Sequence, residues 1–286
     1  MEGTLTSTDV CDALALLRPY DIDIPKIRYG SAGDGGYIFA NATLPSQPLL
    51  SFGVAGNCDL EYEFAERGHK VVMFDPSVEG PPKQHVNFTF HKIGLGGRDD
   101  PETGYVSLAS ALDMAGFRGR NDVILKMDIE GAEFDAFSSA DQQVLLHFDQ
   151  IALEVHWLSK LIDSDFRRQF VDSFNNINAM FTLFHVHANN CAPLLVIGGA
   201  KFVDQHHVVG GAVVAQALEL SYIRSSKVAA HPSRTVYPTV LDKPNYPFSP
   251  DHLLAFFPFL PCDDDTFEKI KLVAKINDLQ YVRRPG

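Results

Sequence analysis

The fold is decided by the stretch Asn121-Asp-Val-Ile-Leu-Lys-Met-Asp128-Ile-Glu-Gly-Ala-Glu-Phe-Asp135. Val123 to Met127 is a short, mostly apolar run that is typical of a buried parallel strand. Carboxylates directly after a buried strand are costly unless they bind something or are well hydrogen-bonded. In open α/β sheets this edge is where ligands bind. The simpler alternative is that Asp128 only caps the helix that follows.

Apolar runs alternate with amphipathic ones on both sides of this stretch. We expect strands at 48–52, 70–75, 86–94, 123–127, 150–157, 180–187 and 218–224. We expect helices at 8–17, 59–67, 107–117, 133–148, 158–179 and 266–279. This alternation predicts an α/β fold with a doubly wound, mostly parallel, seven-stranded Rossmann-like sheet. Residues 1–228 would form one domain with an N-terminal extension, and the proline- and aromatic-rich residues 229–286 would pack on it as a C-terminal extension.

Composition and charge limit the classes of partner. The chain has 286 residues and a net charge of −12, which argues against nucleic acid as a partner. Its four cysteines are far apart and form no Cys-x-x-Cys pair, so neither structural zinc nor a disulfide framework is indicated. No apolar run is long enough for a transmembrane helix, and the N-terminus does not resemble a signal peptide. We therefore expect a soluble, cytoplasmic protein, and the sequence says nothing about its oligomeric state.

A glycine turn and an acidic strand end suggest an adenosine site. Gly53 and Gly56 follow the first expected strand of the alternating region, and Asp75, 22 positions after Gly53, ends the next one. In such βαβ units the backbone approaches the ligand at the glycines, and the carboxylate accepts from the ribose hydroxyls. The nicotinamide fingerprint is broken, because Ala55 and Cys58 occupy its second and third glycine positions. A ligand with adenosine but no pyrophosphate fits this pattern better.

Seven short motifs are spread over the chain. The most specific is Lys126-Met-Asp-Ile-Glu-Gly-Ala-Glu133. The others are Gly33-Asp-Gly-Gly-Tyr37, Ser51-Phe-Gly-Val54, Phe74-Asp-Pro-Ser77, Leu153-Glu-Val-His156, Leu183-Phe-His-Val-His187 and Glu219-Leu-Ser-Tyr-Ile223. Together these motifs resemble those of the FkbM-type methyltransferases, and the animal methyltransferase-like members are especially similar. The resemblance covers about residues 26–224. It implies a class I S-adenosylmethionine fold and methyl transfer, usually to a hydroxyl of a sugar or natural product.

The resemblance also implies where the cofactor S-adenosylmethionine binds. The expected contacts come from the motif loops and the neighbouring strand ends. They are Asp34, Gly36, Tyr37, Phe52, Gly53, Val54, Gly56, Asp75, Pro76, Ser77, Gly94, Leu95 and Asp128.

Methyl transfer to an alcohol needs a way to remove the hydroxyl proton. One arrangement uses a histidine as general base, with His156 as the first candidate and His187 as the second. The other uses Mg²⁺ or another divalent metal, held by Asp128, Glu154 and His156, which would lower the pKa of the hydroxyl. Both arrangements remain open at this point.

Two other classes of function fit the same fold. The chain could be a nucleotide-sugar or NAD-dependent enzyme, although the broken fingerprint speaks against it. It could also be a non-catalytic binding protein with a methyltransferase fold, although carboxylates at three strand ends speak against that. If it is a methyltransferase, its partner is a small-molecule or glycan acceptor. The apolar segment 188–217 is expected to cover the acceptor site.

Overall fold

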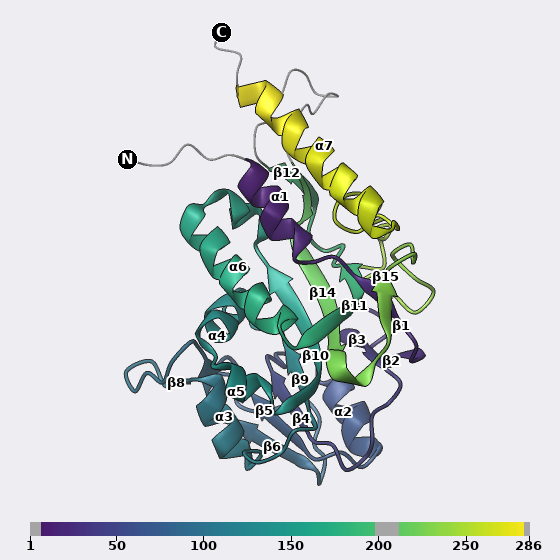
Figure 1. The fold of residues 1–286 in the computed structure, drawn as a ribbon. Helices are drawn as coiled ribbons and strands as arrows, with labels where there is room; N and C mark the ends of the chain where they lie inside the picture. Colours follow the sequence, from purple (N-terminus) through teal and green to yellow (C-terminus); the bar gives the residue numbers. More distant parts are fainter. Residues whose placement is uncertain (1–6, 198–211, 283–286) are drawn as a thin grey trace.

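The structure is a computed structural model that describes residues 7–197 and 212–282. Its centre is a seven-stranded mixed sheet with the order β6-β5-β4-β9-β10-β14-β11, which confirms the expected doubly wound, mostly parallel architecture (Figure 1). The strands of this sheet are β4 (Leu49–Phe52), β5 (Val71–Phe74), β6 (Phe88–His91), β9 (Val123–Met127), β10 (Phe148–His156), β11 (Phe181–Ala188) and β14 (Ala217–Arg224).

One strand interrupts the parallel order. The strands from β6 to β10 pair in parallel, whereas β14 pairs antiparallel with both β10 and β11. The chain reaches β14 from β11 through the antiparallel strands β12 (Leu194–Ile197) and β13 (Ala212–Ala215). The carboxyl ends of β4, β5, β9 and β10 therefore lie along one edge of the sheet, and the start of β14 lies at the same edge, where Ala217 pairs with His156.

Helices cover both faces of the sheet, because alternate side chains of each strand point to opposite faces. On one face Leu50, Leu125 and Leu153 join a core cluster with side chains of α1, α3, α4 and α6. On the other face Leu49 and Ile124 pack with α2 and the hairpin of β2 and β3. These elements are α1 (Ser7–Ala15), α2 (Asp59–Glu66), α3 (Leu108–Ala115), α4 (Glu133–Ser139), α6 (Ser164–Asn178), β2 (Lys26–Gly30) and β3 (Gly36–Ala40).

Two of the expected helices are wrong in their extent. The helix expected at 133–148 ends at Ser139, and α5 (Gln142–Leu145) begins after Asp141, whose side chain accepts a hydrogen bond from the amide of Gln143. The helix expected at 158–179 begins as a 3₁₀ helix, η1 (Leu158–Ile162), before Asp163 caps α6. Aspartate is a strong N-cap residue, so each aspartate starts a new helix inside what looks like one pattern.

The C-terminal extension contacts the N-terminal part of the chain. Strand β15 (Ala230–Pro232) pairs with β1 (Tyr20–Ile22), and the long helix α7 (Asp264–Val282) packs along α1 at the top of Figure 1. Between them, Asp242 accepts a hydrogen bond from His185 of strand β11. Residues after 228 thus contact earlier parts of the chain, and the division into a domain of residues 1–228 and a C-terminal extension stays a prediction. The remaining elements are the strands β7 (Gly94–Leu95) and β8 (Tyr105–Val106) and the 3₁₀ helix η2 (Ser225–Lys227).

Within the described ranges, no helix is both long and apolar enough to cross a membrane. The middle of the segment expected to cover an acceptor, residues 198–211, lies outside the described residues.

Candidate functional site

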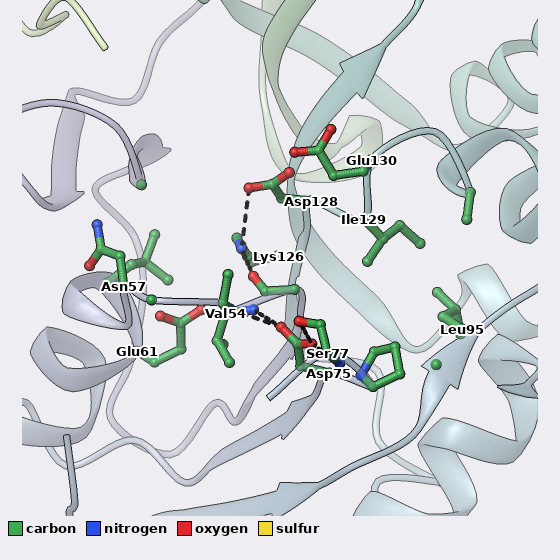
Figure 2. A pocket seen from close by; sticks show the side chains of 18 of the residues that line it. Val54, Asn57, Glu61, Asp75, Ser77, Leu95, Lys126, Asp128, Ile129 and Glu130 are labelled. Atoms are coloured by element: carbon green, nitrogen blue, oxygen red, sulfur yellow. Dashed lines mark hydrogen bonds and ion pairs between the residues drawn. The ribbon is translucent and has the colours of Figure 1, made fainter. Parts of the chain in front are cut away.

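Two neighbouring cavities open at the carboxyl ends of the central strands. The first cavity has a volume of about 480 Å³ and lies over the ends of β4, β5 and β9 (Figure 2). The second cavity has a volume of about 300 Å³ and lies over the ends of β9 and β10. Asp34, Asp128 and Glu130 line both cavities, so the two spaces meet at these carboxylates.

The glycine turn after β4 is built against the end of β9. Gly53 has φ of 75°, and a Cβ placed there would lie 1.7 Å from the carbonyl oxygen of Asp128, so only glycine fits. Lys126 of β9 is buried, and its ammonium donates to the carbonyl oxygens of Phe52 and Gly53. The ammonium also lies 3.7 Å from a carboxylate oxygen of Asp128. This packing presents the turn backbone to the first cavity.

The carboxylate of Asp75 holds the other side of the turn. One oxygen accepts from the amides of Val54 and Ala55 at 2.9 and 2.8 Å, and the other accepts from the amide and hydroxyl of Ser77 at 2.7 and 2.6 Å. Burial raises the pKa of Asp75, but these hydrogen bonds outweigh it, and the net shift is below the usual value. Asp75 is therefore an anion that is bonded to its own chain, and the predicted contact with a ribose stays a prediction.

Most residues predicted to contact a cofactor line the first cavity. These are Asp34, Gly53, Val54, Gly56, Asp75, Pro76, Ser77, Gly94, Leu95 and Asp128. The other three lie behind it: Gly36 packs on Arg28, Phe52 is fully buried, and the hydroxyl of Tyr37 contacts two carboxylates. Sequence reasoning missed Asn57, Glu61, Tyr105, Lys126 and Ile129, which also line this cavity. Lys126 carried a signal, because a lysine inside an apolar strand needs a buried acceptor.

The second cavity brings together Asp128, Glu154 and His156, as the sequence predicted from adjacent strand ends. The Nε2 atom of His156 lies 3.4 Å from Glu154 Oε1 and 3.8 Å from Asp128 Oδ1. Glu130, which was not predicted as a site residue, adds a carboxylate oxygen 3.6 Å from the same nitrogen. On the other side of the ring, Nδ1 lies 3.3 Å from Glu133, a buried residue of α4 that the prediction also missed.

Neutral donors hold these carboxylates in place. The hydroxyl of Tyr37 lies 3.1 Å from an oxygen of Asp128 and 3.1 Å from an oxygen of Glu154. The side-chain amide of Asn189 donates to the second oxygen of Glu154 at 2.8 Å. Burial, with these anions nearby, raises the pKa of Tyr37 well above its usual value, so the phenol remains a donor.

The carboxylates change the proton affinities in the second cavity. Burial alone would lower the pKa of His156, but its hydrogen bonds with Glu133 and Glu154 outweigh burial and raise the pKa to about 11. Burial, together with the charges of Asp128 and Glu219, raises the pKa of Glu154 to about 7. At neutral pH His156 is therefore an imidazolium, and Glu154 is close to its midpoint of titration.

His187, the second candidate base, lies elsewhere. Its Nδ1 pairs with Glu219 at 2.9 Å, and its Nε2 pairs with Asp251 at 3.0 Å. Burial opposes protonation, but these two carboxylates raise the pKa of His187 to about 10. His187 is buried and lines neither of the two cavities, so it joins β11, β14 and the C-terminal extension to one another. His185 of the same strand is buried, and its Nε2 atom lies 2.7 Å from a carboxylate oxygen of Asp242.

Two groups of side chains among the described residues could hold a metal ion. In one, atoms of Asp128, Glu130 and His156 lie within 4.8 Å of one another. In the other, the same holds for Asp34, Glu154 and Glu219. The residues of the predicted metal site thus fall into two groups, and the site itself stays a prediction.

Backbone strain is concentrated at the cavities. Among the described residues, Ala55, Glu130 and Trp157 are the non-glycine residues with positive φ, and each of them lines at least one cavity. Trp157 has φ of 64° and ψ of 33°, its indole N–H donates to the carbonyl of Glu130, and its ring packs over Gly131. Strained residues of this kind often mark ligand sites. The loops around both cavities therefore hold defined, energetically costly conformations.

Comparison with models of known protein families and with curated proteins found no match for this chain. The class of protein that the fold and the site define is therefore a Rossmann-like α/β protein with two joined cavities at the carboxyl ends of its strands.

Proposed function

We propose that the protein is an S-adenosylmethionine-dependent O-methyltransferase of the FkbM type, acting on a hydroxyl of a sugar-like or other small acceptor. One observation carries the proposal: the two cavities meet at Asp128 and Glu130. A cofactor in the first cavity and an acceptor in the second would then face each other across these carboxylates. Alignment of this kind is the main contribution of the protein in a methyl transfer.

The residues of the first cavity fit S-adenosylmethionine. Val54, Leu95 and Ile129 offer apolar surface for an adenine ring, and its volume lies within the usual range for ligand pockets. Asp34 and Asp128 place negative charge at the junction, where a cationic methionine portion would lie. When bound, the cofactor supplies an electrophilic methyl group. Gly53 leaves the turn backbone open to a ligand, since it has no side chain.

The same cavity disfavours a dinucleotide. A pyrophosphate needs free backbone N–H groups at the turn and the helix that follows. Here the amides of Val54 and Ala55 already donate to the carboxylate of Asp75, whose negative charge would also repel a phosphate. This contact supports the cofactor proposal over a nicotinamide or nucleotide-sugar enzyme.

In the second cavity we assign the proton transfer to His156. Its Nδ1 lies against Glu133 and its Nε2 faces the carboxylates that line the cavity, so Nε2 is the atom that would accept the hydroxyl proton. With a pKa of about 11, His156 must lose its own proton first. A positive charge that enters either cavity lowers this pKa, because like charges repel. Glu154 and Asp128 stabilise the imidazolium that forms when the proton is taken.

Metal-assisted deprotonation is the second candidate mechanism, favoured by the close approach of Asp128, Glu130 and His156. We prefer the metal-free route, because Lys126 and His156 already place cationic groups beside Asp128. Turnover after exhaustive EDTA treatment separates the two routes. The metal-free route predicts unchanged turnover, whereas the metal route predicts a loss that Mg²⁺ restores.

Thermal unfolding with candidate ligands tests the proposed function as a whole. S-adenosylhomocysteine at 100 times its Kd should stabilise the fold by about 2.7 kcal/mol, which raises the melting temperature measurably. NAD(H) and UDP-glucose at equal concentrations are the controls, and neither should shift the transition. Stabilisation by one of these controls instead, with no effect of S-adenosylhomocysteine, would overturn the proposal. A non-catalytic binding protein would bind the cofactor but show no methyl transfer to any acceptor.

A further inference from the structure

The second cavity carries a strong excess of negative charge. Asp34, Asp128, Glu130 and Glu154 line it, and His156 is the group of opposite charge among them. Among the described residues that line this cavity there is no lysine or arginine. Lys126 lines the first cavity instead, with its ammonium 3.7 Å from Asp128. Charges in such a partly enclosed space attract cations and repel anions over several ångströms.

A buried carboxylate behind the cavity adds to this excess. Glu133 is 1% exposed and contacts His156 through one oxygen. Its other oxygen is buried and has no hydrogen-bond partner within residues 7–197 and 212–282. Leaving a buried carboxylate oxygen without a partner costs free energy. The imidazole of His156 therefore contacts Glu133 through Nδ1 and the carboxylate of Glu154 through Nε2.

An aromatic ring stands at the edge of the same cavity. Trp157 is 42% exposed, and its strained backbone and its bond to the carbonyl of Glu130 fix the indole beside the carboxylates. Indole faces bind organic cations well, since the ring quadrupole is negative at its face. The ammonium of Lys160 already lies 5.3 Å from the centroid of this ring. Carboxylates beside an indole form a site whose chemistry suits a protonated amine.

We infer that the acceptor carries a protonated amine next to the hydroxyl that receives the methyl group. The inference rests on the proposed function and names the class of its acceptor. The ammonium of the acceptor would lie among the carboxylates of the second cavity, with the indole of Trp157 and its neighbour Lys160 at the edge. A protonated amine has no free electron pair, so the hydroxyl remains the nucleophile. His156 first releases its own proton to solvent. The new O–CH₃ bond then forms as the S–CH₃ bond breaks, and the hydroxyl proton goes to the unprotonated Nε2 of His156. Anionic acceptors are excluded by repulsion, and neutral ones bind more weakly.

Trp157 is the only tryptophan in the chain, so its fluorescence reports on the second cavity directly. The probes are D-glucosamine, N-acetyl-D-glucosamine and D-glucuronate, which share a ring but are cationic, neutral and anionic at neutral pH. We expect glucosamine to change the emission at a concentration at least about tenfold lower than N-acetylglucosamine, as for one charge-assisted contact. Glucuronate should have no effect. Added salt should weaken the glucosamine response, because it screens the carboxylates.

Two matched variants test whether the preference for glucosamine comes from the carboxylates of the second cavity. The preference for glucosamine is the ratio of the N-acetylglucosamine concentration to the glucosamine concentration that gives the same change in emission. In Glu130→Gln this ratio, the concentration advantage of glucosamine, should fall about threefold, as expected for the loss of one partly exposed charge. Glu102→Gln removes another exposed carboxylate, one that lines neither cavity, and it should leave the advantage unchanged. Equal responses to all three sugars, a stronger response to glucuronate, or no response to any of them would overturn the inference.

The outcome is separable from that of the proposed function. Binding of S-adenosylhomocysteine is measured by calorimetry on the same protein. If the cofactor product binds but the sugars show no charge preference, the proposed function stands and the acceptor inference fails. If glucosamine is preferred but S-adenosylhomocysteine does not bind, the cavity is a cation site and the methyltransferase proposal fails.

Discussion

In the first cavity the carboxylate of Asp75 accepts four hydrogen bonds from the chain, whereas in the second cavity Glu154 lies among other acids. The pKa of Asp75 falls below its usual value, and that of Glu154 rises to about 7. The same type of group is thus held as an anion in one place and titrates near neutral pH in the other. Deep burial, together with the neighbouring carboxylates, raises the pKa of Glu154. Asp75 is also buried, but hydrogen bonds from the Ser77 hydroxyl and from backbone amides outweigh burial and lower its pKa.

The largest effect is expected at Gly53, where the turn beside the first cavity packs directly on the backbone of Asp128. In Gly53→Ala the added methyl group would collide with the carbonyl of Asp128, and φ of 75° is unfavourable for alanine. We expect a loss of more than about 3 kcal/mol in the free energy of unfolding, or no folded protein. Denaturant titration measures this. Gly56→Ala is the control, because an added Cβ there meets no atom within 4 Å. Equal stability of the two variants would mean that the turn is not held as described.

The next largest effect concerns the second cavity. His156→Ala should lower turnover by about 10²–10⁴-fold, the usual contribution of a general base, while the affinity for S-adenosylhomocysteine survives. His231→Ala is the control, because this exposed histidine of β15 lines neither cavity. Turnover and calorimetry together separate loss of the base from loss of the fold. Near-normal turnover of His156→Ala would remove this residue as the base.

The pH dependence of turnover tests whether the carboxylates of the second cavity raise the pKa of His156. Since the carboxylates raise the pKa of His156 to about 11, the unprotonated imidazole is rare at neutral pH. The rate should then rise with pH by up to about tenfold per unit below this pKa. Glu133→Gln removes a negative charge beside Nδ1, which lowers the pKa and moves the profile to lower pH. The profile of Glu102→Gln should stay that of the unaltered protein. A profile that is flat above pH 7 would argue against His156 as the base.

The smallest effect is expected at Gly56, where a larger side chain fits without strain and fills part of the first cavity. Gly56 lines the first cavity, and a Cβ added there meets no atom within 4 Å. The side chain of Gly56→Leu would therefore fill part of the cavity, and we expect it to weaken the binding of S-adenosylhomocysteine about tenfold. Gly80→Leu is the matched control, since its Cβ also meets nothing and it does not line the cavity. Calorimetric affinities compare the two variants. Equal affinities would place the cofactor elsewhere.

Much of the sheet and part of the site follow from local sequence patterns. The strand run that ends at Asp128 is short and apolar, and the carboxyl ends of neighbouring parallel strands must meet. Asp128, Glu154 and His156 can therefore be grouped from the sequence alone. Lys126 could have been added, since a lysine in a buried strand needs acceptors.

Other features depend on contacts between distant segments. The break between α4 and α5 is set by Asp141 competing as a cap inside a helical pattern. Asn189 reaches Glu154 only because β14 separates β10 from β11, an order that no local pattern encodes. The orientation of Trp157 requires a positive φ that its residue type does not suggest.

The antiparallel strand β14 has a consequence for biosynthesis. Strands β10 and β11 share no ladder in the seven-stranded sheet, because each pairs with β14, the last of these seven strands to be synthesised. Until residues 217–224 have left the ribosome, β11 has no partner strand in this sheet, and one edge of β10 stays unpaired. The half of the sheet that borders the second cavity therefore assembles late in translation, when β14 pairs with β10 on one side and with β11 on the other.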